Sequence, residues 1–243
     1  MGHDIQSINK AVISCRQCPR LVEWREWVAT HKVRRFRHEE YWGKPLTGFG
    51  DPHAQVVIIG LAPAAHGGNR TGRMFTGDDS GTWLMDALYE SGFASQRSSE
   101  HPDDGLILSN AYVTAAVRCA PPKNKPTRQE AANCFHFLEN ELNLIQPRIV
   151  IVLGRFAYDS FRQYLASLGI EVKPPLKFAH GCQKTWMVNT RSVTLLMSYH
   201  PSRQNTQTKR LTRPMFLDIF QTARSLLESG DLADKAPYCQ ENP

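Results

Sequence analysis

Three short apolar runs constrain the fold of this chain more than any other feature. Val56–Ile59, Ile149–Leu153 and Val193–Met197 are rich in apolar and β-branched residues and do not alternate with polar ones. Such runs are typical of strands that are buried on both faces, as in a parallel sheet. Leu106–Val117 is a fourth candidate strand.

Segments of helical length lie between and after these runs. They are Gly81–Ser91, Thr127–Ile145, Arg155–Leu168 and Leu211–Leu227. Thr127 and Glu130 have the spacing of a capping box, in which each side chain accepts a hydrogen bond from a free backbone N–H, and Pro147 ends that helix. Strands that alternate with helices predict an α/β fold, a three-layer αβα sandwich with a central, mostly parallel sheet.

Composition limits the class of protein. Of the 243 residues, 41% are apolar, and 29 Lys and Arg against 23 Asp and Glu give a formal charge of +6. The apolar content is enough for a core, and no apolar run approaches the roughly 18 residues of a membrane helix. The first ten residues lack the basic flank and apolar stretch of a secretory signal. We therefore expect one cytoplasmic, monomeric domain over 1–243, with a flexible tail from about 230 to 243.

Six cysteines in a chain without an export signal favour metal or redox use over a disulfide framework. Cys15 and Cys18 form a C-x2-C pair, and Cys119 and Cys134 follow much later. Four such sulfurs suit a structural zinc or a [4Fe–4S] cluster, unless they are ordinary buried thiols. No second C-x2-C pair follows, so the spacing favours the cluster over zinc. Cys182 and Cys239 are interpreted as incidental thiols.

Loops with unusual residues follow the predicted strands. In open α/β sheets ligands bind outside the carboxyl ends of strands, so these loops are expected to form one site. The glycine-rich segment 60–81 lacks the spacing of a phosphate-binding P-loop. Within it, Asp78 and Asp79 are candidates to activate water, Phe75 to stack on a planar ring, and Arg70 and Arg73 to bind phosphate. His200, at the end of another strand, is a candidate to stabilise negative charge on a leaving group.

Long motifs in these loops resemble a known family. GLAPAAHGGNRTGRMFTGD, VRCAPPKNKPT and HPSRQNTQT, together with the four cysteines, resemble the family 5 uracil-DNA glycosylases, the iron–sulfur type known from bacteria and archaea. The resemblance extends from about Cys15 to Arg213. It implies the uracil-DNA glycosylase fold, a [4Fe–4S] cluster on Cys15, Cys18, Cys119 and Cys134, and excision of deaminated bases from DNA.

The resemblance also implies roles for individual residues. His200 would donate a hydrogen bond to the base oxygen, while Asp78 and Asn124 would position the attacking water. Phe75 would stack on the flipped base, and Arg203 and Gln204 would fill the gap that this base leaves. The residues expected to bind substrate are Gly60, Leu61, Ala62, Phe75, Ala115, Ser202, Arg203 and Gln204. No lysine has a recognised nucleophile position, so we expect a glycosylase without lyase activity.

Two positions depart from the wider superfamily. Most relatives carry a water-activating carboxylate at the position of Leu61, which cannot activate water. Family 4 relatives place a uracil-reading Asn at the position of Ala115, which cannot pair with a pyrimidine edge. The second departure predicts a broader pocket that accepts uracil, hypoxanthine and xanthine.

Two other functions remain open beside this one. On the strand-end positions of Asp78 and His200 alone, a small-molecule hydrolase is the rival enzyme interpretation. A chain that has lost catalysis would be an iron–sulfur protein that only binds DNA. Arg34, Arg35 and Arg37 are most simply a solvated face rather than phosphate contacts.

Overall fold

The computed structural model describes residues 4–172 and 176–229, which form a six-stranded mixed sheet between two layers of helices. The strands run in the order β1-β3-β2-β4-β6-β5. The four central strands are parallel to one another, and the two edge strands are antiparallel to their neighbours. This confirms the predicted α/β class. The predicted flexible tail lies outside the described residues.

The apolar runs form the centre of the sheet. β2 (Val56–Gly60), β3 (Ala111–Ala115) and β4 (Ile149–Leu153) are buried at every residue, and β6 (Arg191–Ser198) is buried over most of its length. Val56 and Ile58 contact one helical layer, whereas Val57 and Ile59 contact the other. Burial on both faces explains why these runs do not alternate.

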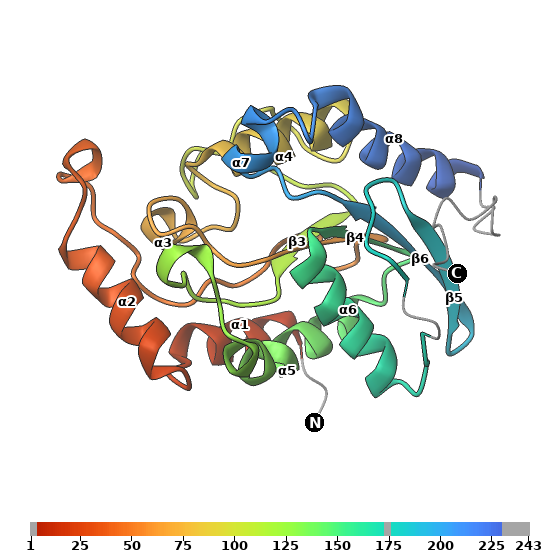
Figure 1. The fold of residues 1–243 in the computed structure, drawn as a ribbon, viewed down its shortest axis with the longest axis horizontal. Helices are drawn as coiled ribbons and strands as arrows, with labels where there is room; N and C mark the ends of the chain where they lie inside the picture. The colour runs from red at the N-terminus through yellow and green to blue at the C-terminus, as the bar shows by residue number, and fades with distance from the viewer. Residues whose placement is uncertain (1–3, 173–175, 230–243) are drawn as a thin grey trace.

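The helices lie on the two faces of the sheet (Figure 1). One layer contains α4 (Asp79–Glu90), α7 (Arg203–Gln207) and α8 (Arg213–Ser229). The other contains α1 (Ile5–Ser14), α2 (Pro19–Thr30), α5 (Arg128–Ile145) and α6 (Arg155–Ser167). The short helix α3 (Gly68–Thr71) and two 3₁₀ turns, η1 (Arg34–Phe36) and η2 (Pro122–Asn124), lie in the connections.

The predicted capping of α5 is confirmed. The Thr127 hydroxyl accepts a hydrogen bond from Glu130 N at 3.2 Å, and the Glu130 carboxylate accepts one from Thr127 N at 2.7 Å. The helix ends at Ile145, before Gln146 adopts a left-handed conformation with φ of 52°. Pro147 follows directly, as the sequence predicted.

The predicted strand at Leu106–Val117 is too long, because only Ala111–Ala115 is a strand. Asn110 precedes it with a positive φ of 56°, which breaks the extended chain. The Asn110 side chain accepts a hydrogen bond from Gln55 N at 2.7 Å, so this residue fixes the start of β3 beside β2. The apolar residue Ile107, on the loop before it, is 64% exposed.

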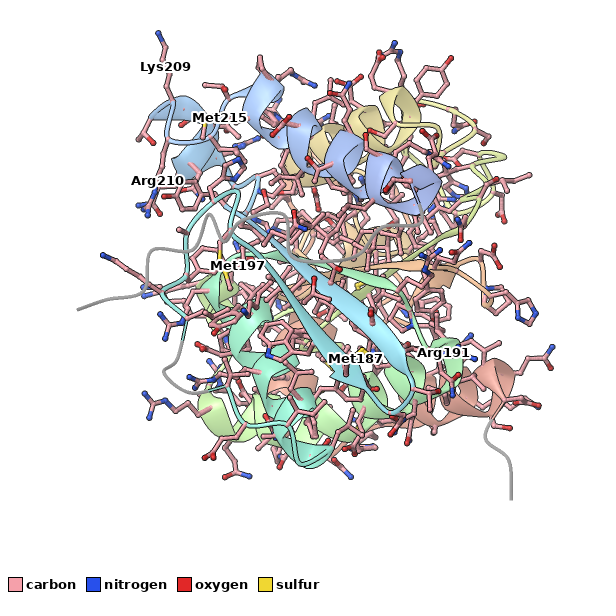
Figure 2. The ribbon with its side chains drawn as sticks, turned by 90° about the vertical axis from the view of Figure 1, so that its right-hand side faces the viewer. Met187, Arg191, Met197, Lys209, Arg210 and Met215 are labelled. Carbon is pink, nitrogen blue, oxygen red and sulfur yellow. The ribbon has the colours of Figure 1, made fainter. Side chains whose placement is uncertain are left out.

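Two edge strands were not predicted. β1 (Phe49–Gly50) has two residues, and β5 (Gln183–Val188) is only partly buried because it closes the opposite edge of the sheet. Figure 2 shows the β5–β6 hairpin, with Met187 and Arg191 near its turn and Lys209 and Arg210 at the far end beside α7. No helix within the described residues is long and apolar enough to cross a membrane.

Candidate active site

A pocket of about 310 Å³ opens at the carboxyl ends of β2, β4 and β6. Leu61 follows β2, the turn 153–156 follows β4, and Tyr199 and His200 follow β6. Asn205 and Arg210, on and after α7, complete one side. The pocket therefore lies at the edge of the sheet where the sequence predicted a site.

His200 is held in a fixed position beside this pocket. Its backbone carbonyl accepts a hydrogen bond from the Asn205 side chain at 2.8 Å. Gly154, which has a φ of 94°, faces it so closely that an added Cβ would stand 3.4 Å from the His200 Cβ. Burial lowers the pKa of His200 to about 4. The imidazole is therefore neutral at neutral pH and can donate a hydrogen bond without carrying charge.

Phe75 lies between His200 and the end of β2. Its ring stacks on the His200 ring with 6.3 Å between centroids and 28° between planes. Phe75 has a positive φ of 51°, and an added Cβ on Gly60 would stand 2.8 Å from its ring. Gly60 pairs in register with Ala115, which is buried in the same core cluster that Phe75 packs against. Three predicted substrate residues and the predicted catalytic His200 thus meet in one place.

Asp78 is the N-cap of α4. One of its carboxylate oxygens accepts a hydrogen bond from Gly81 N at 2.8 Å. The other lies against Gly67, where an added Cβ would approach it to 2.0 Å. Burial raises the pKa of Asp78 above its usual value, which makes the carboxylate a stronger base. The sequence motif therefore places a desolvated carboxylate at a helix N-terminus.

The start of α4 is joined to the segment after His200. The Ser80 hydroxyl donates to the Pro201 carbonyl at 3.0 Å, and Asp79 forms an ion pair with Arg203. Ser202 caps α7, and Gln204 is exposed on its first turn. Asp79 and Arg203 are thus partners of each other on the surface, and this pair fixes α4 beside α7.

Two predicted substrate residues and one predicted catalytic residue lie apart from this group. The Asn124 side chain is exposed in η2 and, among the described residues, contacts neither Asp78 nor His200. Ala62 packs against the core cluster that contains the cysteines rather than lining the pocket. Gln204 likewise does not line it. Of the predicted site residues, only Leu61 and His200 line the pocket itself, and Asn124, Ala62 and Gln204 also lie apart from the group around Phe75.

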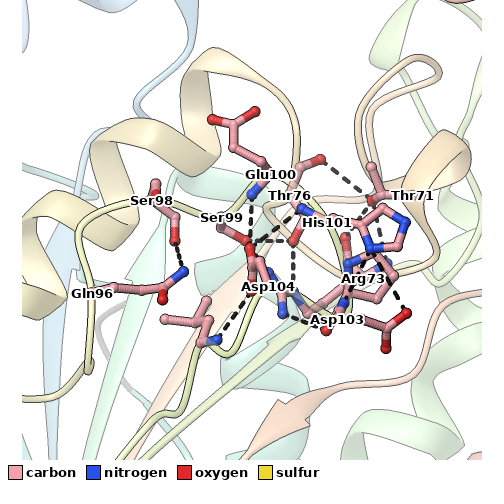
Figure 3. A network of polar contacts seen from close by, with 12 residues as sticks. Thr71, Arg73, Thr76, Gln96, Ser98, Ser99, Glu100, His101, Asp103 and Asp104 are labelled. Atoms are coloured by element: carbon pink, nitrogen blue, oxygen red, sulfur yellow. Dashed lines mark hydrogen bonds and ion pairs between the residues drawn. The ribbon is translucent and has the colours of Figure 1, made fainter.

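The expectation that Arg70 and Arg73 bind phosphate is wrong, because both guanidinium groups are buried and already paired. Arg73 donates to Thr76, Ser99, Asp104 and the Pro102 carbonyl, at distances between 2.7 and 2.9 Å (Figure 3). The Asp104 carboxyl is partly desolvated, yet Arg73 and three backbone N–H groups hold its pKa at about 2. Arg73 thus ties the 95–105 loop to the loop that carries Phe75 and Asp78.

The four predicted metal ligands line one narrow cavity. Cys15 ends α1, Cys18 caps α2, Cys119 follows β3, and Cys134 lies on α5. All four are free of disulfides. Burial raises the pKa of Cys119 to about 12 and of Cys134 to about 11. Among the described residues, no group of three or more His, Cys, Asp or Glu side chains is arranged around a single metal ion.

Two buried arginines border the same cavity. Arg25, which is 2% exposed, donates to Cys119 Sγ at 2.9 Å and to the Cys15 carbonyl at 3.3 Å. Arg118, which is 1% exposed, also lines the cavity. Asn133 approaches Cys18 Sγ at 3.5 Å. The sulfurs therefore have the charge of Arg25 and N–H donors beside them, which suits an anionic group, whereas Arg118 is paired with Glu141.

Cys182 does not fit the prediction of an incidental thiol. It is fully buried and disulfide-bonded, and so it is not a free thiol. The prediction for Cys239 lies outside the described residues.

Sequence reasoning missed the part of the pocket that β4 supplies. Gly154 and Arg155 follow a predicted strand, so the strand-end rule that identified His200 applies equally to them. Asn205 and Arg210 had no such signal, because their positions depend on how the 201–210 segment folds back.

Comparison with known proteins identifies the family. The model of the uracil DNA glycosylase superfamily matches residues 47–224. A type-5 uracil-DNA glycosylase of Thermus thermophilus is 48% identical over 224 residues, 92% of this chain and 98% of that protein.

Two enzymes from one further organism distinguish two types within the superfamily. The type-5 uracil-DNA glycosylase of Pyrobaculum aerophilum is 43% identical over 212 residues, 87% of this chain and 88% of that protein. The type-4 enzyme of the same organism is 24% identical over 230 residues, 94% of this chain and 95% of that protein. This chain therefore belongs to the uracil DNA glycosylase superfamily and, within it, to the type-5 uracil-DNA glycosylases.

Proposed function

We propose that this chain removes uracil from DNA by hydrolysing the N-glycosidic bond, which leaves an abasic site in an intact strand. The observation that carries the proposal is the neutral, partly buried His200 at the end of β6, stacked on Phe75 beside an open pocket. Glycosylases take the target base out of the helix and hold it in such a pocket. The Phe75 ring offers a flat apolar face on which a base can stack.

The reaction needs negative charge to be stabilised on the departing base. As the C1′–N1 bond breaks, the electron pair goes to the base and the sugar acquires cationic character. A neutral imidazole N–H aimed at the base oxygen donates a hydrogen bond that strengthens as negative charge develops on that oxygen. We assign this role to His200, and the base then takes its proton from solvent.

Water must be oriented toward C1′, and Leu61 carries no group to do so. We assign this role to Asp78, because burial strengthens its carboxylate as a base, and the hydrogen bond from Gly81 N holds one oxygen while the other lies against Gly67. A negative carboxylate near C1′ also stabilises the cationic sugar. Asn124 is a weaker candidate, because its side chain is exposed in η2 and would have to turn toward the site when DNA binds.

The pocket is also proposed to accept hypoxanthine and xanthine. Ala115 is buried beside Gly60, where an Asn amide would pair with a pyrimidine edge and Ala offers no such contact. A site that lacks buried hydrogen-bonding groups rejects other bases less strongly.

A strand-cleavage assay on duplexes with one deaminated base tests both proposals. Uracil duplexes should stay intact with the enzyme alone and break at the target after alkali. Hypoxanthine and xanthine duplexes should form alkali-sensitive sites more slowly. Ala115→Asn should raise the ratio of uracil to hypoxanthine excision by about tenfold, the effect of one good pairing contact.

Each other outcome of this assay has a definite meaning. Wild-type enzyme that binds uracil duplex but yields no alkali-sensitive site would indicate a chain that only binds DNA. Activity confined to free nucleosides would indicate a small-molecule hydrolase. An unchanged ratio in Ala115→Asn would refute the account of breadth.

We further propose that Cys15, Cys18, Cys119 and Cys134 hold a [4Fe–4S] cluster. Four thiolates on one zinc ion would stand about 3.8 Å apart, given Zn–S bonds of about 2.3 Å, whereas a four-iron cluster has one iron per thiolate and separates its ligands further. Four free thiols around one cavity, with buried Arg25 beside Cys119, support this donor set. When bound, the cluster would tie α1, α2, α5 and the loop after β3 together and contribute folding free energy.

The cluster is tested by colour and metal content. Purified protein should absorb near ~400 nm and contain iron, and Cys134→Ala should lose both. Colourless wild-type protein with one zinc ion per chain would refute the cluster.

A further inference from the structure

One surface feature plays no part in the pocket or the cysteine cavity. After α2 the chain runs through His-Lys-Val-Arg-Arg-Phe-Arg-His, residues 31–38, which contain four Lys and Arg and no acid. This segment, which includes η1 and is here named the basic arm, stands out from the helical layers at the end of the molecule beyond α3 (Figure 1). Arg34, Arg35 and Arg37 are exposed.

The charges of the basic arm have no carboxylate partners within the described residues. Exposed arginines elsewhere, such as Arg16, Arg97 and Arg213, form ion pairs with neighbouring acids. In contrast, no ion pair neutralises Arg34, Arg35 or Arg37, and Arg37 donates only to the adjacent His38. The nearest acid in sequence, Glu39, is already paired with Arg70. The arm therefore presents concentrated, unneutralised positive charge.

The basic arm is nevertheless anchored, and its anchor is the loop that carries the proposed catalytic carboxylate. The Arg70 guanidinium lies 4.0 Å from the centre of the Phe36 ring and also pairs with Glu39. Arg70 donates in turn to the Gly77 carbonyl, next to Asp78, at 3.1 Å. Because Arg70 holds both the arm and the residue before Asp78, the arm has a fixed place relative to the site.

A second set of contacts fixes the chain directly after the arm. The Tyr41 hydroxyl lies 3.1 Å from His66 Nδ1, and Trp42 N donates to the Arg70 carbonyl at 2.9 Å. Gly43 N donates to the Asn69 carbonyl at 3.1 Å. Because these contacts already fix the segment, it loses little conformational entropy when it binds a partner.

We propose that the basic arm binds the phosphates of the DNA that flanks the flipped nucleotide. DNA carries one charge per about 1.7 Å of axis, which complements a row of free guanidinium groups. Guanidinium is well suited to phosphate because its N–H groups form a fork that matches two oxygens. The inference rests on the proposed function in one respect, that the bound polymer is DNA. A duplex whose flipped base enters the pocket must continue past the pocket along the protein surface.

The test compares two double variants that remove equal charge. Arg34→Gln/Arg37→Gln alters the arm, and the control Lys10→Gln/Arg191→Gln removes two exposed cations on α1 and at the β5–β6 turn (Figure 2). Binding is measured on a duplex of about 30 base pairs with a stable abasic analogue, across a salt series. Excision is measured on a uracil-containing single strand of about five nucleotides, which fills little more than the pocket.

The arm variant should bind the duplex about tenfold more weakly than the wild type. The slope of log Kd against log salt should be smaller by about 1.8 than in the wild type, because each of the two lost phosphate contacts contributes about 0.9. The control should change duplex binding by less than about twofold. Both variants should excise uracil from the short strand at the wild-type rate. If the two variants bind the duplex with the same affinity, the arm is refuted as a flanking-DNA contact. It is also refuted if the arm variant loses as much excision rate on the short strand as it loses affinity for the duplex. Wild-type enzyme that binds duplex tightly but never releases uracil would refute the proposed function instead.

Discussion

Asp78→Asn is expected to lower the single-turnover rate of uracil excision by about 10²- to 10⁴-fold, the usual contribution of a positioned general base. Asn is isosteric with Asp but cannot accept a proton from water or carry negative charge near C1′. Asn also caps helices as well as Asp does, so α4 and the hydrogen bond from Gly81 N should survive the change. Affinity for an abasic-analogue duplex should therefore stay near the wild-type value.

The neighbouring carboxylate supplies a matched control. Asp79 is exposed and paired with Arg203, so Asp79→Asn removes the same charge one residue away and loses only a surface ion pair. It should change the excision rate by less than about threefold. Near-normal excision by Asp78→Asn together with a large loss in Asp79→Asn would transfer the water-positioning role to Asp79.

The pH dependence of the rate provides a second readout for Asp78. The carboxylate acts only when ionised, and burial raises its pKa, so wild-type excision should fall on the acidic side at a higher pH than an ordinary Asp would give. His200 should add no such limb near its usual pKa, since burial holds that pKa at about 4. The residual excision rate of Asp78→Asn should not show this fall at acidic pH.

The central strands and the helices α4, α5, α6 and α8 could be predicted from the sequence, because their patterns are local, whereas α1, α2, α3 and α7 were missed. β2 and β4 were predicted within one residue, since two-sided burial leaves a continuous apolar run. α2 was missed because its buried face includes Arg25, whose burial depends on Cys119, 94 residues further along. β5 was missed because an edge strand with half-exposed side chains has no clear period.

The residues of the candidate site likewise divide into those that a local sequence pattern predicts and those whose roles depend on the fold. His200 was predicted because it directly follows a buried strand, and Phe75 and Asp78 because they lie in a motif of unusual composition. The roles of Arg70 and Arg73 were not predictable, since a guanidinium that binds phosphate and one that braces a loop look alike in sequence. Only the fold brings Glu39 to Arg70 and Asp104 to Arg73.

The same limitation hid a fully buried ion pair beside the cysteine cavity. Glu141 on α5 accepts from Arg118 at 3.0 and 2.5 Å, from Thr114 at 2.6 Å and from Tyr112 at 3.2 Å. Both charged side chains are at most 1% exposed. Arg118 precedes Cys119, and Glu141 shares its helix with Cys134, so the pair joins the end of β3 to α5.

Glu141→Ala should therefore reduce the free energy of unfolding by about 3–5 kcal/mol, because it leaves the Arg118 guanidinium buried and unpaired. In a chain of 243 residues this corresponds to a fall of about 10 °C in Tm. The control Asp159→Ala breaks the exposed pair with Arg155 and should cost less than about 1 kcal/mol. Denaturant unfolding of the three proteins checks both values.

A double variant separates the loss of charge balance from the loss of packing. Arg118→Met/Glu141→Leu removes both charges and keeps apolar volume, so it should recover much of the stability that Glu141→Ala loses, because no uncompensated charge remains in the core. If the double variant is instead less stable than Glu141→Ala, an unpaired Arg118 is not the main cause of the loss, since both variants lose the hydrogen bonds from Thr114 and Tyr112. A loss in Glu141→Ala no larger than that of Asp159→Ala would contradict the whole account, since a fully buried carboxylate with four hydrogen bonds would then behave as a surface one.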